Sequence, residues 1–356
     1  LYALTNPGAM PCDEEFFNLT NGKYGLDAKY LLCNGPFHVS KWTEKTSVKL
    51  AKNNEYNGES SVSPSSVTFY INNDDSEVAD KMNSVTYDVA FLSSSQFSSI
   101  ENKKDLNSVA VQNVTYSFIF NQNDNNYRNK NMRLAFCRSC DTSSLFDSQS
   151  DISKADGIVP PSCKIGGEDY RNGNAAELLS YDETLAKKNF NDALLELGSS
   201  SVETTILCTE QYEPFVKQMV QKLQKTLGVK FVSTVKVVSE SDLEAAVNDG
   251  NYSVAFYPFK AKSSFAGEII EGFDQNNIFG YESDVLSQKI RNIKNNSGSL
   301  EGERSAVADA ENYLVSEAVI MPVFYENSYF VTSKKTSGIY FYSSADNVCF
   351  INAKKS

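Results

Sequence analysis

The sequence has almost no histidine and no long apolar run, and both absences narrow the possible functions. One histidine, His38, occurs in 356 residues, which leaves little for general acid–base catalysis or a histidine-rich metal site. The HExxH, Gly-x-Ser-x-Gly and Gly-rich phosphate-loop signatures are absent. No run of about 18 apolar residues occurs, so no segment is predicted to span a membrane. We therefore predict that the protein is not an enzyme and needs no cofactor.

Basic residues are outnumbered, which argues against nucleic acid as a partner. The chain has 33 Lys and Arg against 45 Asp and Glu, for a formal net charge of -12. A phosphate-binding surface needs clustered cations, and no basic patch interleaved with aromatic residues appears. At 356 residues the chain is too long for one ordinary core, so two lobes or domains are expected.

The seven cysteines are an odd number, so at least one thiol is free or pairs with another molecule. Cys137 and Cys140 are three residues apart in a helix-like segment, which puts both sulfurs on one helical face. A zinc site needs further ligands, and Cys163 with the distant His38 complements the pair poorly. We predict no metal and favour buried, small apolar side chains, with metal or redox chemistry as the alternative.

The stretch from Asn34 to Gly58 predicts a β-hairpin. Residues 37–42 and 48–52 alternate apolar and polar side chains, as strands with one buried face do, and a short polar connection joins them. Alone, this pattern predicts a surface hairpin. Its Gly-Pro-Phe start, its Trp and its Lys-Asn-x-x-Tyr-x-Gly end resemble the signature hairpin of the family 5 extracellular solute-binding proteins. These are the oligopeptide- and dipeptide-binding receptors of ABC importers.

Several later segments resemble the same family, in the same order along the chain. Each motif is weak alone, but their shared order is specific. They are the Met-Arg-Leu-Ala helix at 130–136, the proline-marked loop at 157–161, the Tyr-Asp-x-x-x-Ala-Lys helix at 181–197, the Leu-Gly-Val junction at 227–229, the Asp-x-Leu helix at 283–293 and the return crossing at 318–325.

The resemblance implies an α/β fold of two hinged lobes, periplasmic-binding-protein-like (type II, cluster C), with mixed sheets and an incomplete lobe I. Residues 1–128 would form the remaining part of lobe I, and residues 129–320 a parallel α/β lobe II. Residues 321–356 would be the return segment of lobe I. One hinge crossing is expected near 121–129. In the resembling family the hairpin lies well inside the chain, after a large part of lobe I, so the resemblance implies that an N-terminal part of lobe I is missing from this sequence. The sequence begins at Leu1 without an initiator Met or a charged signal segment, so it does not show the location directly.

The same resemblance implies a receptor that captures a small ligand, foremost a peptide, between its lobes and delivers it to ABC permease subunits. It would be a monomer at the bacterial cell surface or in the periplasm, meeting the membrane only through a lipid anchor that this chain lacks. Two alternatives stay open. One is a signalling or surface-interaction domain derived from such a receptor, and the other is a receptor for a non-peptide anionic solute.

The candidate ligand-binding residues follow from the position of the predicted strands. In α/β sheets ligands lie beyond the carboxyl ends of strands, and two successive strand–helix–strand units are predicted over 203–259. The candidates at or near such strand ends are Ser94, Thr209, Tyr212, Tyr257, Phe259 and Lys260. The resemblance of 318–325 to the return crossing of the family implies that Phe324 and Tyr325 also lie at the edge of the cleft.

The segment after the predicted strand 252–257 departs from the family. Peptide receptors of this family commonly carry a Trp and an Asp here, and the carboxylate holds the α-ammonium of the ligand. This chain has lysines instead and no acidic residue before Glu268, and a lysine cannot replace a buried carboxylate. Lys260 could meet an anionic group of a ligand, with a solvated lysine as the alternative, while Tyr257 and Phe259 keep the aromatic wall of such a pocket.

Three further expectations concern local structure. Strand 67–71, helix 74–83 and strand 87–92 predict a crossover unit with two parallel strands. Residues 93–96 are then predicted as a loop at the cleft, or else as a solvated serine-rich turn. Residues 273–280 are predicted as a polar, mobile segment.

Overall fold

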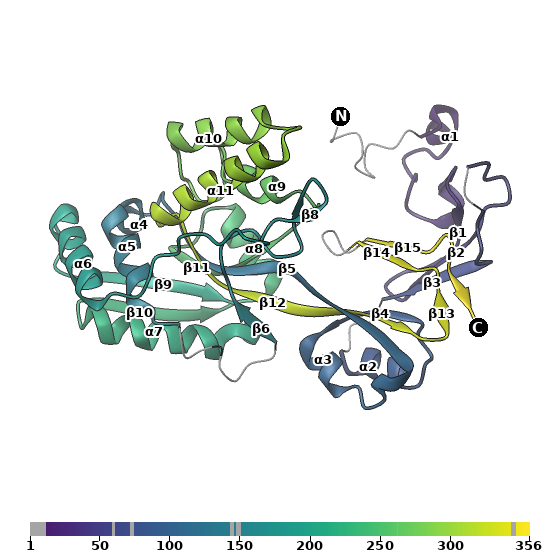
Figure 1. The fold of residues 1–356 in the computed structure, drawn as a ribbon, viewed down its shortest axis with the longest axis horizontal. Coiled ribbons are helices and arrows are strands. Elements are labelled where there is room, and N and C mark those ends of the chain that lie inside the picture. The colour runs from purple at the N-terminus through teal and green to yellow at the C-terminus, as the bar shows by residue number, and fades with distance from the viewer. Residues whose placement is uncertain are drawn as a thin grey trace. The chain divides into compact units, whose positions relative to one another are not determined.

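The computed structural model divides into two compact units, and Figure 1 shows the elements of each. The residues that it describes are 12–58, 61–71, 75–142, 146, 151–261, 263–342 and 347–356. Unit 1 consists of the described residues up to Val109 together with 329–342 and 347–356. Unit 2 consists of the described residues of 110–328.

Unit 2 is built on a mixed β-sheet. Strand β9 is parallel to β10 and β11, and β11 is antiparallel to β5. The two predicted crossover units within 129–320 are therefore present, with parallel strands. The long strand β5, which precedes that range, joins them in the opposite direction, so the sheet as a whole is mixed, as predicted. The strands in spatial order are β10 (Phe231–Val237), β9 (Val202–Cys208), β11 (Val254–Lys260), β5 (Leu106–Phe120) and β12 (Ile320–Ser333), with β6 (Ile152–Lys154) paired to β12.

Helices cover both faces of this sheet (Figure 1). One face packs against α5 (Lys130–Ser139), α6 (Glu183–Leu197) and α7 (Glu213–Leu227). The other face packs against α8 (Glu240–Asn248), α9 (Ala266–Glu271), α10 (Asp284–Asn295) and α11 (Leu300–Ser316). The remaining elements of unit 2 are α4 (Asn125–Arg128), a 3₁₀ helix at Glu210–Tyr212, β7 (Lys164–Ile165) and β8 (Glu168–Asp169).

Capping residues define the ends of the helices, and apolar residues at helical spacing define the faces that pack on the sheet. In α7, Val216, Met219 and Leu223 recur at helical spacing and are all buried, so one face of the helix packs on the sheet. The side chain of Asp182 accepts a hydrogen bond from the Leu185 N–H and caps α6. Gly198 ends α6 at φ +63°, a left-handed conformation that glycine adopts without strain.

A buried ion pair holds the loop after β6 against α11. The Glu311 side chain is 1% exposed and pairs with Arg171, whose side chain is 8% exposed. One carboxylate oxygen also accepts the N–H groups of Ile158 and Val159, at 2.7 and 2.9 Å. The other accepts the Tyr170 hydroxyl at 3.0 Å and an Arg171 N–H at 2.9 Å. The charge is therefore saturated with donors, as a buried carboxylate must be.

The segment 273–280 is ordered, so the prediction of a polar, mobile segment is wrong. The rings of Phe273 and Phe279 are each 1% exposed and stack at 4.6 Å. Between them, the Asn277 side chain accepts the N–H groups of Phe279 and Tyr281 and donates to the carbonyls of Phe273 and Tyr281. The Asn277 side chain thus forms the hydrogen bonds to backbone N–H and C=O groups that hold this loop together.

In unit 1 the predicted hairpin is present as β1 (Phe37–Thr43) and β2 (Ser47–Lys52). Strand β3 (Ser66–Tyr70) adds to β2, also antiparallel. The other elements are α1 (Glu14–Leu19), 3₁₀ helices at Ala28–Tyr30 and Lys103–Asp105, α2 (Asp75–Asn83), β4 (Val89–Ser93), α3 (Ser94–Ser99), β13 (Thr336–Ser337) paired with β16 (Lys354–Lys355), and β14 (Tyr340–Tyr342) paired with β15 (Asn347–Cys349).

The predicted parallel pairing of the strands on either side of α2 is wrong. Strand β3 belongs to the three-stranded sheet, whereas β4 pairs with β12. The Ser333 N–H of β12 donates to the Asp88 carbonyl just before β4, at 2.8 Å. Helix α2 therefore connects strands of two sheets, a topology that the local strand–helix–strand pattern cannot distinguish from a crossover within one sheet.

The chain passes between the units within β5 and β12. The division falls at 109/110 and 328/329, whereas the sequence predicted 128/129 and 320/321. The single strand β5 carries one crossing, and it lies before the predicted hinge at 121–129. The assignment of these segments to lobes I and II stays a prediction.

Candidate functional site

Four strands of unit 2 bring polar and aromatic side chains together near one edge of the sheet. Strand β11 pairs with β5, which places Pro258 opposite Tyr116 and Lys260 opposite Val114. Strand β12 carries Phe324 and Glu326, two residues apart and so on one face. Strand β9 leads through Thr209 into the 3₁₀ helix that ends at Tyr212. We call Tyr116, Tyr212, Lys260, Phe324 and Glu326 the strand-edge site.

Aromatic rings form the floor of the strand-edge site. The ring of Tyr116 lies 4.3 Å from that of Tyr212 and 5.1 Å from that of Phe324, between centroids. The ring of Phe256 lies 5.5 Å from that of Tyr116 and 5.5 Å from that of Phe324. Tyr212 and Phe324 are 8% and 0% exposed, so the rings stack into one apolar block beneath the polar groups.

A carboxylate lies above this floor. The Tyr212 hydroxyl donates to Glu326 Oε1 at 2.6 Å. Burial raises the pKa of Glu326 and the nearby charge of Glu240 raises it further, while the hydrogen bond from Tyr212 and the charge of Lys260 oppose the shift. Burial, the neighbouring tyrosine and Glu326 also raise the pKa of Tyr212, which stays a neutral donor. The site is thus a partly desolvated carboxylate that a cationic ligand group would stabilise.

Two of the predicted residues lie on the opposite face of β11. Tyr257 and Phe259 alternate with Phe256 and Lys260 along the strand, so they point away from the strand-edge site. The Phe259 ring packs on Phe273, 5.8 Å away between centroids, within the other core. Strand β11 extends to Lys260 rather than ending at 257, so Tyr257 and Phe259 lie on the other face of the strand from Lys260. The part of Tyr257 and Phe259 in ligand binding stays a prediction.

Three other predicted residues are also outside the strand-edge site. The Tyr325 hydroxyl accepts the Asp156 N–H at 3.0 Å and faces the loop after β6, with the residue 2% exposed. Thr209 is half-buried and makes no capping bond. Ser94 is 3% exposed in unit 1, where Ser93 and Gln96 form a capping box at the start of α3, so residues 93–96 are not a loop.

Sequence reasoning missed Tyr116 and Glu326. Glu326 lies two residues after the predicted Phe324, so strand alternation alone places both on one face. Tyr116 is opposite Pro258 only through the antiparallel register of β11 and β5, which no local pattern shows. The structure therefore supplies a carboxylate near the position where the sequence showed only lysines.

The cysteines are unpaired, and four of them are buried. These are Cys137, Cys140, Cys163 and Cys208. Burial raises the pKa of both Cys137 and Cys163 to about 12, so their thiols are neutral and weakly nucleophilic at neutral pH. Among the described residues, no group of three or more His, Cys, Asp or Glu side chains is arranged to hold a metal.

The chain belongs to the bacterial extracellular solute-binding proteins of family 5. The family profile, "Bacterial extracellular solute-binding proteins, family 5 Middle", matches residues 3–279. This confirms the predicted family, which is one of binding proteins rather than enzymes. No helix in the described part of the chain is both long and apolar enough to cross a membrane.

Known proteins of similar sequence and fold agree with this family. The chain is 23% identical over 347 residues to the dipeptide-binding protein DppE of Bacillus subtilis (strain 168), covering 95% of the chain and 63% of that protein. Listeria monocytogenes OppA bound to peptide superposes with a TM-score of 0.75 at 20% identity, over 98% of this chain and 70% of that one.

A third similar structure carries the same fold. The substrate-binding domain of an oligopeptide ABC transporter from Bacillus anthracis str. Ames has a TM-score of 0.74 at 18% identity, over 98% of this chain and 70% of that one. The predicted α/β fold of the periplasmic-binding-protein kind is therefore confirmed. Because the chain spans 63% of the length of DppE, ligand and partners belong to the proposal below.

Proposed function

We propose that the chain is part of an extracytoplasmic receptor that captures a peptide and delivers it to an ABC permease. The observation that carries the proposal is the Glu326 carboxylate, held by Tyr212 above an aromatic floor in unit 2. A carboxylate there can hold the α-ammonium of a peptide, the task that an Asp after the preceding strand performs in peptide receptors of this family. The peptides bound by the similar DppE and OppA proteins support this ligand class.

The chemistry of the site suits a zwitterion. Glu326 offers a negative charge whose ionised form burial disfavours, so pairing with a ligand ammonium relieves an electrostatic cost. The faces of Tyr116 and Tyr212 add cation–π attraction. Lys260, exposed at the end of β11 and close enough to act on Glu326, offers a positive charge for a ligand carboxylate.

Binding would act through the equilibrium between open and closed receptors. A ligand shifts such an equilibrium only by its difference in affinity for the two states. Strands β5 and β12, which pass from one unit to the other, are the segments in which hinge rotation would be absorbed. The permease would then recognise the closed, loaded receptor.

Thermal unfolding with a ligand panel tests the proposal. The protein is expected to melt at a higher temperature with di- and oligopeptides than with free amino acids or sugars, because a ligand at 100 times its Kd adds about 2.7 kcal/mol to stability. Matched peptides with an acetylated N-terminus are the control, since they lack the ammonium that Glu326 would hold. No shift with any peptide, or equal shifts with acetylated peptides, would contradict the proposal.

The Lys260→Ala protein is expected to bind free-acid peptides roughly tenfold more weakly, a loss of about 1.4 kcal/mol for one partly exposed charge pair. Peptides with a C-terminal amide are expected to bind the variant and the unmodified protein alike. Titration calorimetry measures both, with Lys236→Ala, an exposed lysine on the edge strand β10, as the matched control. Unchanged affinity for free-acid peptides would exclude Lys260 as the anchor of the peptide carboxylate.

A further inference from the structure

Unit 2 contains a cavity that shares no residue with the strand-edge site. Its volume is about 380 Å³. Apolar side chains from β12 and the segment before α6 form much of its wall, and Lys154, Ser180 and Tyr181 on its rim are exposed. The cavity is therefore a polar-rimmed opening with a buried floor, which a small solute or an ion can reach.

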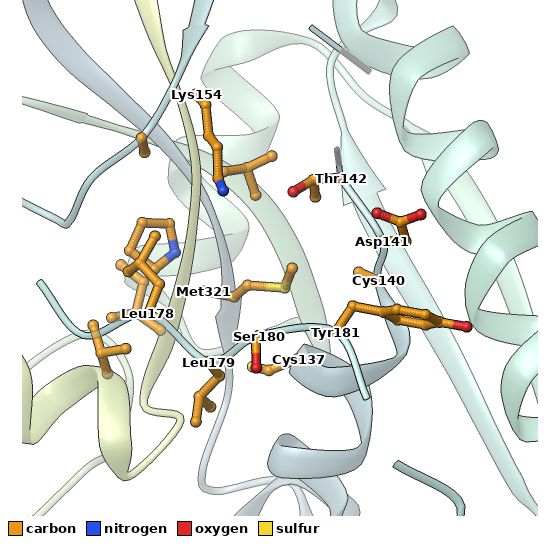
Figure 2. A pocket seen from close by; sticks show the side chains of 15 residues that line it. Cys137, Cys140, Asp141, Thr142, Lys154, Leu178, Leu179, Ser180, Tyr181 and Met321 are labelled. Atoms are coloured by element: carbon orange, nitrogen blue, oxygen red, sulfur yellow. The ribbon is translucent and has the colours of Figure 1, made fainter. Parts of the chain in front are cut away.

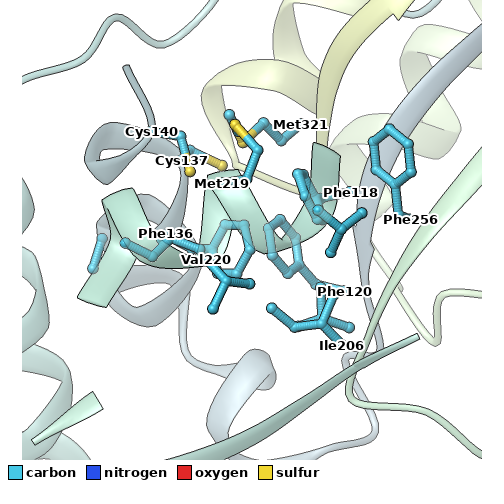
Figure 3. Packing of buried hydrophobic residues seen from close by; sticks show 14 of the residues in the cluster. Phe118, Phe120, Phe136, Cys137, Cys140, Ile206, Met219, Val220, Phe256 and Met321 are labelled. Atoms are coloured by element: carbon cyan, nitrogen blue, oxygen red, sulfur yellow. The ribbon is translucent and has the colours of Figure 1, made fainter. Parts of the chain in front are cut away.

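Three sulfur atoms lie at this floor. Cys137 and Cys140, at the C-terminal end of α5, line the cavity together with Met321 of β12. They are 2%, 4% and 9% exposed, respectively. Figure 2 shows Met321 extending from β12 toward the two cysteines, and Figure 3 shows the same three side chains close together from another direction. Met219 of α7 belongs to the same hydrophobic cluster as Cys137, Cys140 and Met321.

Positive charges act on both thiols. The charges of Arg133 and Arg138 act on Cys137, and that of Lys222 acts on Cys140. The Nε atom of Arg138 is buried and, among the described residues, has no hydrogen-bond partner. A buried guanidinium nitrogen without an acceptor is costly. A centre with a net negative charge on the cysteine sulfurs would lower this cost.

We propose that the cavity floor binds a soft monovalent cation, Cu(I) or its probe Ag(I), through the sulfurs of Cys137 and Cys140, with the Met321 thioether as an additional ligand. Thiolate and thioether sulfurs select Cu(I) over harder ions. Each thiol gives its proton to solvent as its sulfur bonds to the ion. Two thiolates and one monovalent cation leave a net charge of minus one, which Arg133, Arg138 and Lys222 offset.

The donor set differs from that of a zinc site. The cysteine pair has no second pair beside it in the sequence, and the one histidine, His38, lies in a distant strand. A Cu(I) ion needs only two or three soft ligands, and the third comes from a residue some 180 positions further along the chain, which reaches the pair only through the packing of β12 beside α5. The inference does not depend on the peptide receptor function.

Cu(I) titration of the whole chain, in reductant and without oxygen, against a competing chromogenic chelator tests the proposal. The less buried thiols Cys12, Cys33 and Cys349 are first replaced by serine, because they would bind Cu(I) by themselves. This background protein is expected to bind one equivalent. Cys137→Ser or Cys140→Ser removes a direct ligand. Each is therefore expected to weaken Cu(I) binding by more than the roughly 10- to 100-fold loss that follows when a residue behind a metal ligand is altered.

Two further variants distinguish the loss of a copper ligand from a general loss of folded protein. Met321→Leu conserves volume and fold and is expected to weaken Cu(I) binding about tenfold, within the range for a secondary ligand. Cys208→Ser, a matched change at a buried cysteine that does not line the cavity, is expected to leave binding unchanged. Equal affinity in the Cys137→Ser and background proteins, or equal losses in the Cys137→Ser and Cys208→Ser proteins, would overturn the proposal.

Discussion

The Glu326→Gln protein is expected to bind peptides with a free α-amino group at least about 2 kcal/mol more weakly, roughly thirtyfold in Kd. The glutamine keeps the shape of the side chain and can still accept the hydrogen bond of the Tyr212 hydroxyl. It lacks the charge, so a ligand ammonium that enters the strand-edge site would be desolvated without a counterion. Titration calorimetry with one peptide and its acetylated form measures the loss, which the acetylated form is expected not to show.

In the absence of a ligand, the Glu326→Gln substitution is expected not to destabilise the protein, although it weakens peptide binding. Burial raises the pKa of Glu326 in the folded state, so the folded state binds a proton over a pH range in which the unfolded state has released it. The stability of the unmodified protein therefore falls as pH rises through that range. Glu326→Gln removes this term, and the variant is expected to be at least as stable at neutral pH. Lower affinity without lower stability distinguishes a ligand anchor from a structural carboxylate.

The pH dependence of binding provides the second measurement. Only the ionised carboxylate can pair with an ammonium, so affinity is expected to fall as pH drops below the raised pKa of Glu326. The Glu326→Gln protein is expected to lack this dependence. Glu240→Gln is the control, because Glu240 acts on Glu326 only through its charge and lies at the start of α8. Unchanged affinity and an unchanged pH profile in Glu326→Gln would exclude Glu326 as the anchor.

Local periodicity was enough to predict most elements of unit 2. The apolar spacing of Val216, Met219 and Leu223 predicted α7, and the structure confirms it. The hairpin of β1 and β2 followed from alternation in the same way. The pattern of each element is contained in a few consecutive residues, although only α7 buries a whole face, while every residue of β1 and β2 is exposed or half-buried. The strands around α2 were paired wrongly, because the choice of partner strand depends on contacts far away in the sequence.

The site was predicted only in part for the same reason. Tyr212 and Lys260 follow predicted strands and Phe324 lies in the predicted return crossing, and the structure brings all three together. Glu326 lies beyond the predicted end of that crossing at 325, whereas β12 continues to Ser333. An error of a few residues in a strand boundary changes which side chains are expected to extend beyond the strand, and Tyr257 lies within β11 rather than at its end.

The Glu311→Gln protein is expected to lose about 3–5 kcal/mol of unfolding free energy in unit 2, the cost of breaking a buried ion pair on one side. Burial alone would lower the pKa of Arg171, and the Glu311 charge raises it above its usual value. Without that charge Arg171 stays buried and uncompensated. The amide nitrogen of a glutamine would also face donors that now converge on the carboxylate, such as the Ile158 N–H or the Tyr170 hydroxyl.

Denaturant unfolding followed by far-UV circular dichroism measures this loss. Tryptophan fluorescence is unsuitable, because the one tryptophan, Trp42, lies in unit 1 and does not report on unit 2. Asp309→Asn is the matched control. It removes the same charge from the same helix, but Asp309 is 59% exposed and pairs with Lys289 at the surface, so a loss below about 1 kcal/mol is expected. Equal losses in the two variants would show that burial does not decide the strength of the Arg171–Glu311 pair. A loss confined to Glu311→Gln would make this pair the main polar anchor of the loop after β6, which also carries the Asp156 N–H that Tyr325 accepts.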